Sequence, residues 1–402
     1  VTAERTITIM GDKQHPANAG RLCSKGTWLS ETVGLEGRLL YPSLGDQRVT
    51  WNTALDHVAD RMRETIAEHG PDSVAFYVSG QLLTEDYYVA NKLAKGFIGT
   101  GNIDTNSRLC MASAVAAHKR AFGEDVVPCS YSDLDEADLI LLVGSNTAWC
   151  HPVIWQRIEA AREARGTKLV VIDPRVTETA ALADLHIPVA PDGDIALFNA
   201  LLAACRNAGL IDRAFVQAQC EADDGFIDSL RSGLHGIDRE KFAALVRLVA
   251  ENPRTITLFS QGANQSACGT DKGNAIINFH LATGRINKAG AGPFSITGQP
   301  NAMGGREVGG LANMLACHLG FSPDELSAVE QFWQAPNMCT GPGQKAVDMF
   351  RQDHAGQIKS LWVMATNPAV SMPDAGFVRE ALNRCPTLVV SDVMADTDTA
   401  RY

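Results

Sequence analysis

The sequence contains no cluster of five or more basic residues, and its formal net charge is −11. Nucleic acids and anionic membrane surfaces attract proteins through concentrated positive charge, so we expect neither as a partner. Long hydrophobic runs are also missing. The longest apolar stretches, such as residues 139–143, are far shorter than the roughly 20 residues that a membrane-spanning helix requires. Such short runs are typical of buried strands instead.

A dense disulfide framework is absent as well. The 402 residues include ten cysteines at irregular intervals, many of them in apolar or helical surroundings. This usage favours a reducing compartment and predicts a cytoplasmic protein. No targeting segment is visible after Val1, and the sequence stops at Tyr402 without a helix cap or a polar tail, so we expect a fragment of a longer protein.

Short β-branched apolar runs alternate with long helical patterns, which predicts an α/β fold with parallel sheets. The length suggests two or three domains. Most expected strands end in a loop rich in glycine, asparagine, aspartate or serine, and ligands of open α/β sheets bind beyond the carboxyl ends of the strands. The expected strands are residues 73–80, 139–146, 168–175, 186–190, 255–262, 360–367 and 387–392.

Two strand–loop–helix–strand segments resemble each other. In the first, Asp173 follows Asn146 by 27 residues, and in the second, Asp392 follows Asn367 by 25 residues. Each segment is typical of a nucleotide-binding half in which the acidic residue binds a sugar hydroxyl. A true internal repeat predicts two nucleotide-like ligands, whereas the alternative is that any two βαβ units look alike.

Residues 284–310, between these two segments, are rich in glycine. A flexible linker would contain more serine and more charge, whereas this stretch includes Phe294, Gln299, Asn301 and Arg306. We therefore interpret it as an ordered loop that lines a buried ligand.

Cys110 lies in "NSRLCMASA", where a polar loop gives way to a helical pattern. The helix dipole favours a thiolate at such a position, and Arg108 adds a nearby positive charge. A nucleophilic cysteine normally needs a base within reach, and His118 is eight residues away, which is about two helical turns. Spacing alone leaves three interpretations of Cys110 open: a soft-metal ligand, a nucleophile and a buried structural cysteine.

Cys23 is the second informative thiol, because it lies in a polar loop between glycines with Lys25 two residues later. An iron–sulfur cluster needs four ligands, and no other cysteine precedes Cys23. If Cys23 is a cluster ligand, its three partners lie before Val1.

Several stretches together resemble one known family. They are "HPANAGRLCSKG", "SGQLLTEDYYVANKLAKGFIGTGNIDTNSRLCMASAVAAHKRAFG", "LVGSNTAWCHPVIWQRI", "NQSACGTDKGNAIINFHLATGRINKAGAGPFSITGQPNAMGGREVGGLAN" and "WVMATNPAVSMPD". The chain is similar, from about residue 8 to its end, to the assimilatory nitrate reductases, the bis-molybdopterin guanine dinucleotide branch of the dimethyl sulfoxide reductase superfamily. The resemblance implies a molybdenum enzyme that lacks its first cysteine triplet and its C-terminal cofactor-capping domain.

The resemblance implies roles for individual residues. Cys110 would be the molybdenum ligand beside the dithiolene sulfurs of two pterins, and Cys23 the fourth ligand of a 4Fe-4S cluster. Lys25 would lie between cluster and pterin, unless it is a solvated surface lysine. The positions that match dinucleotide contacts, each of which is otherwise an ordinary turn residue, are Gln81, Asn106, Gly144, Ser145, Asn146, Asp173, Asp194, Gln265, Asn367, Ser391 and Asp392.

Three further residues bear on substrate and compartment. Related formate dehydrogenases have histidine after the metal-binding residue, whereas Met111 gives the Cys-Met pair of nitrate reductases and would form an apolar wall, unless it only packs in the core. Cys268, in "NQSACG", replaces the arginine of periplasmic relatives and so favours a cytoplasmic enzyme. Arg306 is then the candidate for attracting the anion, unless it pairs with Glu307 or a pterin phosphate.

The resemblance also implies a domain plan and a reaction. The plan is a remnant of the iron–sulfur domain at residues 1–49, a discontinuous α/β domain at 50–112 and 286–402, and an inserted α/β domain at 113–285, with one dinucleotide on each α/β domain. The expected reaction is the reduction of nitrate to nitrite, with electrons from ferredoxin, flavodoxin or an NADH-linked reductase. The alternatives are a formate dehydrogenase of the same fold, a non-catalytic electron-transfer or structural subunit, and a thiol-dependent enzyme.

Overall fold

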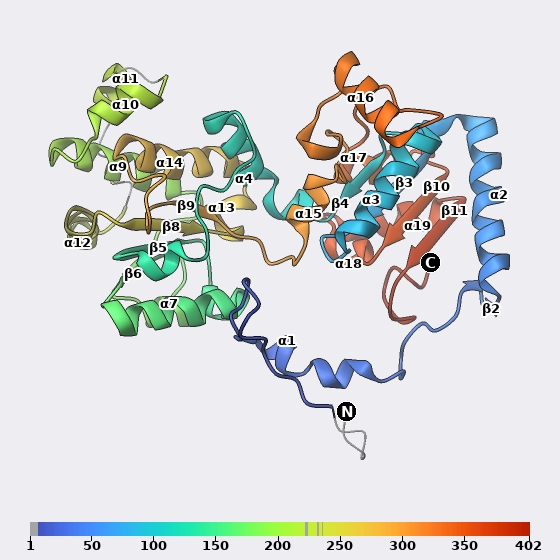
Figure 1. The fold of residues 1–402 in the computed structure, drawn as a ribbon, viewed down its shortest axis with the longest axis horizontal. Helices are drawn as coiled ribbons and strands as arrows, with labels where there is room; N and C mark the ends of the chain where they lie inside the picture. Colours follow the sequence, from blue (N-terminus) through green and yellow to red (C-terminus); the bar gives the residue numbers. More distant parts are fainter. Residues whose placement is uncertain (1–6, 222–223, 231–232, 235) are drawn as a thin grey trace. The chain divides into compact units, whose positions relative to one another are not determined.

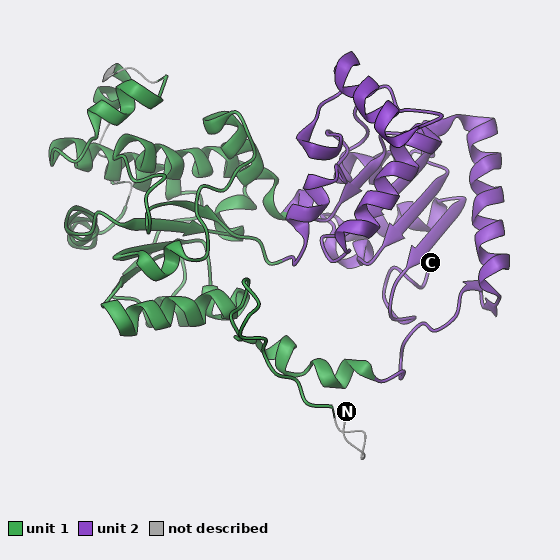
Figure 2. Cartoon of the chain, in the orientation of Figure 1, with its two compact units in different colours: residues 1–33, 110–298 green, residues 34–109, 299–402 purple. Residues whose placement is uncertain are grey.

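The computed structural model describes residues 7–221, 224–230, 233–234 and 236–402. The chain forms two compact units, and each is built around one parallel sheet (Figures 1 and 2). Unit 1 comprises residues 1–33 and 110–298, and unit 2 comprises residues 34–109 and 299–402.

The sheet of unit 1 has the strand order β7-β6-β5-β8-β9, with all neighbours parallel. Successive side chains face opposite layers, so Leu141 packs with helices α9 and α14, and Leu142 packs with helix α7 on the other face (Figure 1). Because both faces are covered, these strands read as continuous apolar runs. The elements of this part of the chain are α1 Ser24–Thr27, η1 Leu29–Val33, α4 Ser107–Phe122, α5 Asp133–Glu136, β5 Leu139–Val143, α6 Thr147–Cys150, α7 Pro152–Arg165, β6 Lys168–Ile172, α8 Glu178–Ala181, β7 Leu185–Ile187, α9 Asp194–Asn207, α10 Arg213–Gln219, α11 Asp224–Ser229, α12 Arg239–Glu251, β8 Thr255–Phe259, α13 Gln261–Asn264, α14 Gly269–Ala282 and β9 Gly292–Ser295.

The sheet of unit 2 has the order β11-β10-β3-β4 and is also parallel. Tyr77 packs with helices α17 and α19, whereas Phe76 packs with α2 and α3 on the opposite face. The elements are β1 Ser43–Leu44, β2 Gln47–Arg48, α2 Trp51–His69, η2 Pro71–Ser73, β3 Val74–Val78, α3 Thr84–Lys92, the π-helical η3 Leu93–Ile98, β4 Ile103–Thr105, α15 Ala302–Glu307, η4 Ala316–His318, α16 Pro323–Trp333, α17 Ala346–His354, β10 Ser360–Met364, α18 Pro368–Ser371, α19 Ala375–Arg384 and β11 Thr387–Ser391.

The seven strands expected from the sequence are confirmed, and the structure adds two edge strands and a hairpin. Strand β4 has three residues and gives no clear pattern. Strand β9 reads "GPFS", and a strand with glycine and proline is tolerated because it lies at the sheet edge. The hairpin β1–β2 has two residues in each strand. These elements are too short or too unusual in composition to detect from periodicity.

The internal repeat extends to the neighbouring strands. The pair β5–β6 in unit 1 corresponds to β10–β11 in unit 2, and each pair has one more parallel strand on the side of its first member, β8 and β3 respectively. Strands β9 and β4 follow in the same relative places. The corresponding strands lie in the same order across the two sheets, but their order along the chain differs. Strands β3 and β4 precede β10, whereas β8 and β9 follow β5.

The glycine-rich stretch at residues 284–310 contains β9 and α15, so it is not a featureless linker. Residues 286–298 belong to unit 1, since β9 pairs with β8 there. The expected assignment of residues 1–49, 50–112 with 286–402, and 113–285 to one cluster domain and two dinucleotide domains stays a prediction. Within the described residues, no helix is both long and apolar enough to cross a membrane.

Candidate cofactor site

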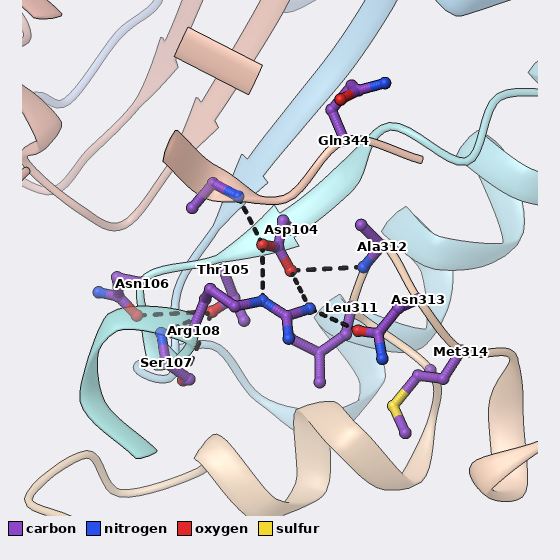
Figure 3. A network of polar contacts seen from close by, with 12 residues as sticks. Asp104, Thr105, Asn106, Ser107, Arg108, Leu311, Ala312, Asn313, Met314 and Gln344 are labelled. Carbon is purple, nitrogen blue, oxygen red and sulfur yellow. Dashed lines mark hydrogen bonds and ion pairs between the residues drawn. The ribbon is translucent and has the colours of Figure 1, made fainter. Parts of the chain in front are cut away.

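A buried ion pair fixes the chain where β4 leads into helix α4 (Figure 3). The fully buried Asp104 accepts hydrogen bonds from Arg108 Nε and Nη2, both at 3.0 Å, and from the backbone nitrogens of Ala312 at 3.3 Å and Ala346 at 2.7 Å. Arg108 Nη2 also donates to Asn313 Oδ1 at 2.6 Å. The guanidinium charge is therefore matched by a carboxylate that has four donors around it.

This pairing corrects the expected role of Arg108. The sequence suggested that its charge favours a thiolate at Cys110, but the guanidinium is directed at Asp104 and Asn313. A cation that is already neutralised by a buried anion contributes little to a second site. Arg108 instead anchors the first turn of α4.

The Cys110 thiol lies in the first turns of α4 and contacts two polar side chains of unit 1. Gln261 Nε2 donates to Sγ at 3.2 Å, and Thr297 Oγ1 lies 3.3 Å from Sγ. The cysteine is half-buried and packs against the core of the unit. His118 is buried and stacks with Phe122, with its Nδ1 3.9 Å from Asp125 Oδ1, which places it in the core rather than in the role of a base for Cys110.

Met111 is 8% exposed and belongs to the core cluster of unit 1. Its Sδ accepts a hydrogen bond from Asn264 Nδ2 at 3.3 Å. Together with the bond from Gln261 to Cys110, this contact joins α4 to the short helix α13 that follows β8. Met111 thus packs beneath the carboxyl end of the sheet.

Two glycines let the loops after β5 and β8 touch. Gly262 N donates to Gly144 O at 3.0 Å, and a Cβ on Gly144 would lie 2.7 Å from the backbone of Gly262 and Ala263. Gly144 also has a φ of +54°, a conformation that favours glycine. The close approach holds the two loops together at the carboxyl edge of β5 and β8, which is where ligands of open α/β sheets bind.

The predicted contacts Ser145 and Asn146 lie in the loop after β5. Ser145 is buried and shares a hydrogen bond of 2.9 Å with Thr147 Oγ1, and Asn146 Oδ1 accepts one of 2.7 Å from Thr179 Oγ1. Asp173, at the end of β6, is 7% exposed and accepts a hydrogen bond from Arg175 N at 2.9 Å. These three predicted residues lie at one edge of the sheet of unit 1, as expected.

Asp194 is held by a lysine that the sequence reasoning missed. Lys272, 2% exposed, lies 3.0 Å from Asp194 Oδ2 and 2.9 Å from Asp192 Oδ1, and it donates to Gly262 O at 3.3 Å. Burial opposes its charge, but the two carboxylates outweigh this and raise the pKa of Lys272. Ser266 and then Lys272 lower the pKa of Asp192 to about 2.

In unit 2 the predicted contact Asn106 ties three loops together. Its Nδ2 donates to Ser79 Oγ at 3.2 Å and to Thr366 Oγ1 at 3.1 Å, and its Oδ1 accepts from Gly80 N at 3.0 Å. Since these bonds use both ends of the amide, Asn106 organises the carboxyl edge of β3, β4 and β10. Gln81, another predicted nucleotide contact of unit 2, is exposed in the loop after β3.

The other predicted residues of unit 2 lie beyond β10 and β11. Asn367 Oδ1 accepts from Thr399 Oγ1 at 2.7 Å, and Ser391 Oγ accepts from Trp362 Nε1 at 2.9 Å. Asp392 accepts from Val393 N at 2.7 Å. Asp392 and Asp173, the two acidic residues of the repeat, therefore each cap a turn at the carboxyl edge of their own sheet.

Lys25, Cys23 and an unpredicted histidine lie in the same unit as Cys110. His151 is 8% exposed, and neither of its ring nitrogens makes a hydrogen bond. Burial is the largest cause that lowers the pKa of His151, and the positive charge of Lys25 acts in the same direction. Sequence reasoning missed His151, although its place directly before Pro152, the first residue of α7, was a local signal.

The remaining predicted residues are less enclosed. Cys23 is half-buried at the start of α1, and Lys25 is exposed. Arg306 is half-buried on α15, and Gln265 is exposed after α13. Cys268 Sγ lies 3.3 Å from Ser266 Oγ. Among the residues that the structure describes, no group of three or more His, Cys, Asp or Glu side chains is arranged so that it could hold a metal ion.

The residues present fit a large anionic group that brings most of its own metal ligands. Cys110 offers one thiol with a donor directed at it. His151 offers buried ring nitrogens without partners, which cost free energy unless a ligand or water satisfies them. These features match the donor set expected for a pterin-bound soft metal.

Residues 38–402 match the molybdopterin oxidoreductase family. The chain belongs to this family. Membership implies a molybdenum–pterin cofactor. The solved structure of the acetylene hydratase from Pelobacter acetylenicus has a similar fold, with a TM-score of 0.72. That likeness covers 96% of this molybdopterin oxidoreductase chain and 57% of the other chain at 20% identity, and it concerns the fold alone.

Two bacterial proteins named nitrate reductase are similar over nearly the whole chain. The one from Klebsiella oxytoca is 54% identical over 98% of this chain and 46% of its own length, and the one from Shewanella frigidimarina is 50% identical over 98% and 43%. This molybdopterin oxidoreductase chain thus spans about half the length of the curated relatives it matches. Other relatives are named assimilatory nitrate reductase, periplasmic nitrate reductase and F420-dependent formate dehydrogenase, at 37%, 34% and 31% identity.

Proposed function

We propose that the chain is the cofactor-binding part of an assimilatory nitrate reductase. It would reduce nitrate to nitrite at a molybdenum bis(molybdopterin guanine dinucleotide) held by Cys110. The observation that carries the proposal is the setting of the Cys110 thiol, with Gln261 and Thr297 in contact, in a chain about half identical to proteins named nitrate reductase.

When bound, the cofactor supplies two-electron oxygen-atom transfer, and the balanced reaction uses one nitrate, two electrons and two protons to give nitrite and water. The chain's own residues would orient the cofactor and its surroundings. Gln261 and Thr297 fix the direction of Sγ. His151 offers ring nitrogens to polar atoms of the pterin, and Lys272 balances the carboxylates beside the loop of Gly262.

The dinucleotide form is supported by the duplicated sheet edge. One guanine nucleotide would bind the loops of unit 1 through Gly144, Ser145, Asn146, Asp173, Asp194 and Gln265. The other would bind those of unit 2 through Gln81, Asn106, Asn367, Ser391 and Asp392. In both units the proposed contacts follow the carboxyl ends of parallel strands, where nucleotides bind in open α/β sheets.

Nitrate is an anion, and the chain has a formal net charge of −11, so its attraction requires local positive charge. Arg306 is the proposed group. Arg108 is excluded from this role because Asp104 already pairs with it. Met111 would favour nitrate over formate chemistry by offering a thioether where a base is needed for formate.

Electrons would arrive through a 4Fe-4S cluster, with Cys23 as one ligand and Lys25 close to the pterin. Support comes from the place of Cys23 and Lys25 in unit 1, the unit to which Cys110 also belongs. The donor would be ferredoxin, flavodoxin or an NADH-linked reductase. Cys268, in place of an arginine, supports the assimilatory and cytoplasmic type over the periplasmic one.

A formate dehydrogenase is the second candidate, because a relative with that name is 31% identical over 99% of the chain. The test is to purify the full-length protein anaerobically and to measure molybdenum, guanine nucleotide and the oxidation of reduced viologen by nitrate. We expect about one molybdenum and two guanine nucleotides per chain together with nitrate-dependent oxidation. Reduction of viologen by formate without nitrate activity favours the second candidate, and absence of molybdenum contradicts both.

A further inference from the structure

The same three-residue arrangement occurs at the carboxyl edge of both sheets. In unit 1, Thr179 Oγ1 donates to Asn146 Oδ1 at 2.7 Å and accepts from Ala148 N at 3.0 Å. Both bonds join the loop after β5 to α8, which follows the acidic turn after β6. The threonine is 0% exposed, so water does not replace these bonds.

In unit 2, Thr399 Oγ1 donates to Asn367 Oδ1 at 2.7 Å and accepts from Ala369 N at 3.2 Å. The backbone nitrogen of Thr399 adds a third bond to the same Oδ1 at 3.0 Å. Thr399 is also 0% exposed. The threonine follows its asparagine by 33 residues in unit 1 and by 32 in unit 2. We call the two arrangements the Asn–Thr pairs.

The pairs fix which end of each asparagine amide faces the site. A buried threonine hydroxyl that accepts from a backbone N–H has its one hydrogen left for a neighbouring acceptor, and in both units that acceptor is the asparagine Oδ1. Flipping the amide would leave this hydrogen without an acceptor, which is costly in a buried place. Nδ2 of Asn146 and of Asn367 is therefore the end that remains for an outside acceptor, and both asparagines are only half-buried.

Within the described residues, the donor end of Asn367 has one weak acceptor. Nδ2 of Asn367 makes one long contact, at 3.4 Å, with the exposed Asp398 Oδ2. Such a contact is readily replaced by a stronger acceptor. In addition, each threonine holds the first turn of the short helix after the asparagine, α6 or α18, through Ala148 or Ala369.

We propose that Thr179 and Thr399 are positioning residues that orient Asn146 and Asn367 to donate from Nδ2 to an oxygen of a bound guanine nucleotide, one in each unit. This inference rests on the proposed function, which supplies two nucleotides. It goes beyond it by assigning roles to two threonines that neither the sequence motifs nor the comparisons singled out.

The experiment uses the full-length holoenzyme and measures the rate at which guanine nucleotide is released on dilution. Thr179→Val and Thr399→Val remove each hydroxyl at nearly constant volume, and Thr179→Ser and Thr399→Ser keep it. Loss of one oriented hydrogen bond corresponds to roughly tenfold faster release, so each valine variant should release nucleotide about tenfold faster than the wild type. The serine variants should match the wild type.

Thr167→Val is the matched control. Thr167 is also buried and donates to Ala137 O at 2.8 Å, but it precedes β6 at the amino edge of the same sheet. It should lower the thermal midpoint of the apoprotein without changing nucleotide release. The inference would be overturned if both valine variants released nucleotide at the wild-type rate. It would also be overturned if the serine variants released nucleotide as fast as the valine variants. Wild-type protein without guanine overturns the proposed function and the inference together, whereas guanine and molybdenum without nitrate reduction overturns the reaction alone.

Discussion

Cys110 is positioned by residues that are remote from it in the sequence. Gln261 and Thr297 contact its sulfur from 151 and 187 residues away, whereas Arg108, two residues away, pairs with Asp104. The sequence could predict that a thiol begins helix α4, because the local pattern contains that signal. It could not predict which groups surround the sulfur, since those contacts depend on how β8 and β9 lie in the sheet.

Buried charges were harder still to predict, because their partners come from different elements. Lys272 looks like a surface residue in sequence, yet it is 2% exposed between Asp192 and Asp194. Removing one partner of a buried ion pair leaves the other charges uncompensated. We predict that Lys272→Met lowers the free energy of unfolding by about 3 to 5 kcal/mol in urea denaturation. Lys288→Met, at an exposed lysine of the same unit, is the control and should change it by less than about 0.5 kcal/mol.

Asp353 provides a test of pH dependence. Its carboxylate is 1% exposed without a hydrogen-bond partner, and burial raises its pKa to about 7, partly offset by Cys385. In the unfolded chain this carboxyl group has its ordinary pKa of 3.8, so the folded state loses stability as the pH rises from about 4 to about 7 and loses no more above that.

We therefore predict that Asp353→Asn stabilises the protein at pH 8 by about 4 kcal/mol more than it does at pH 4. The measurement is urea denaturation at both values of pH. Asp348→Asn, on the same helix and half-exposed beside Arg351, should show no such difference. An equal effect of Asp353→Asn at both pH values would show that its carboxyl group is not held neutral by burial.

At the scale of elements, the candidate site lies in the loops that follow the strands. Glycines in these loops set how closely two loops approach each other. Periodicity identified seven strands, and the residues that follow them are the predicted contacts. The short strands β4 and β9 were not predicted. Strand β4 has only three residues and β9 begins with Gly-Pro, so neither shows the alternation of apolar and polar residues that indicates a strand. The crossing of Gly144 and Gly262 was not predictable either, since it requires β5 and β8 to be neighbours.

Gly144 and Gly166 separate two effects of adding a side chain. Both have positive φ, +54° and +74°, but a Cβ on Gly144 meets backbone at 2.7 Å, whereas one on Gly166 meets nothing within 4 Å. We predict that Gly166→Ala costs about 1 kcal/mol of unfolding free energy, from φ alone. Gly144→Ala should cost at least about 2 kcal/mol more, because the two loops must separate. Equal thermal midpoints for the two variants would contradict this explanation.

At the scale of the whole molecule, the same sheet order occurs twice, and two proposed nucleotide sites follow from that duplication. The sequence indicated the repeat through two Asn-to-Asp segments, but β3 and β8 occupy equivalent places although they stand on opposite sides of their segments in the chain. Only the structure could reveal this permutation. The Asn–Thr pairs are the most local part of this duplication, since an asparagine, a threonine and an alanine make the same two hydrogen bonds in each unit.

X-ray absorption at the molybdenum edge of the full-length protein measures whether the thiol of Cys110 binds molybdenum. We expect that Cys110→Ser retains the cofactor, loses one sulfur neighbour of the metal and no longer oxidises reduced viologen with nitrate, since a hydroxyl is a poor ligand for a soft metal. An unchanged number of sulfur neighbours in Cys110→Ser would show that Cys110 is not the ligand.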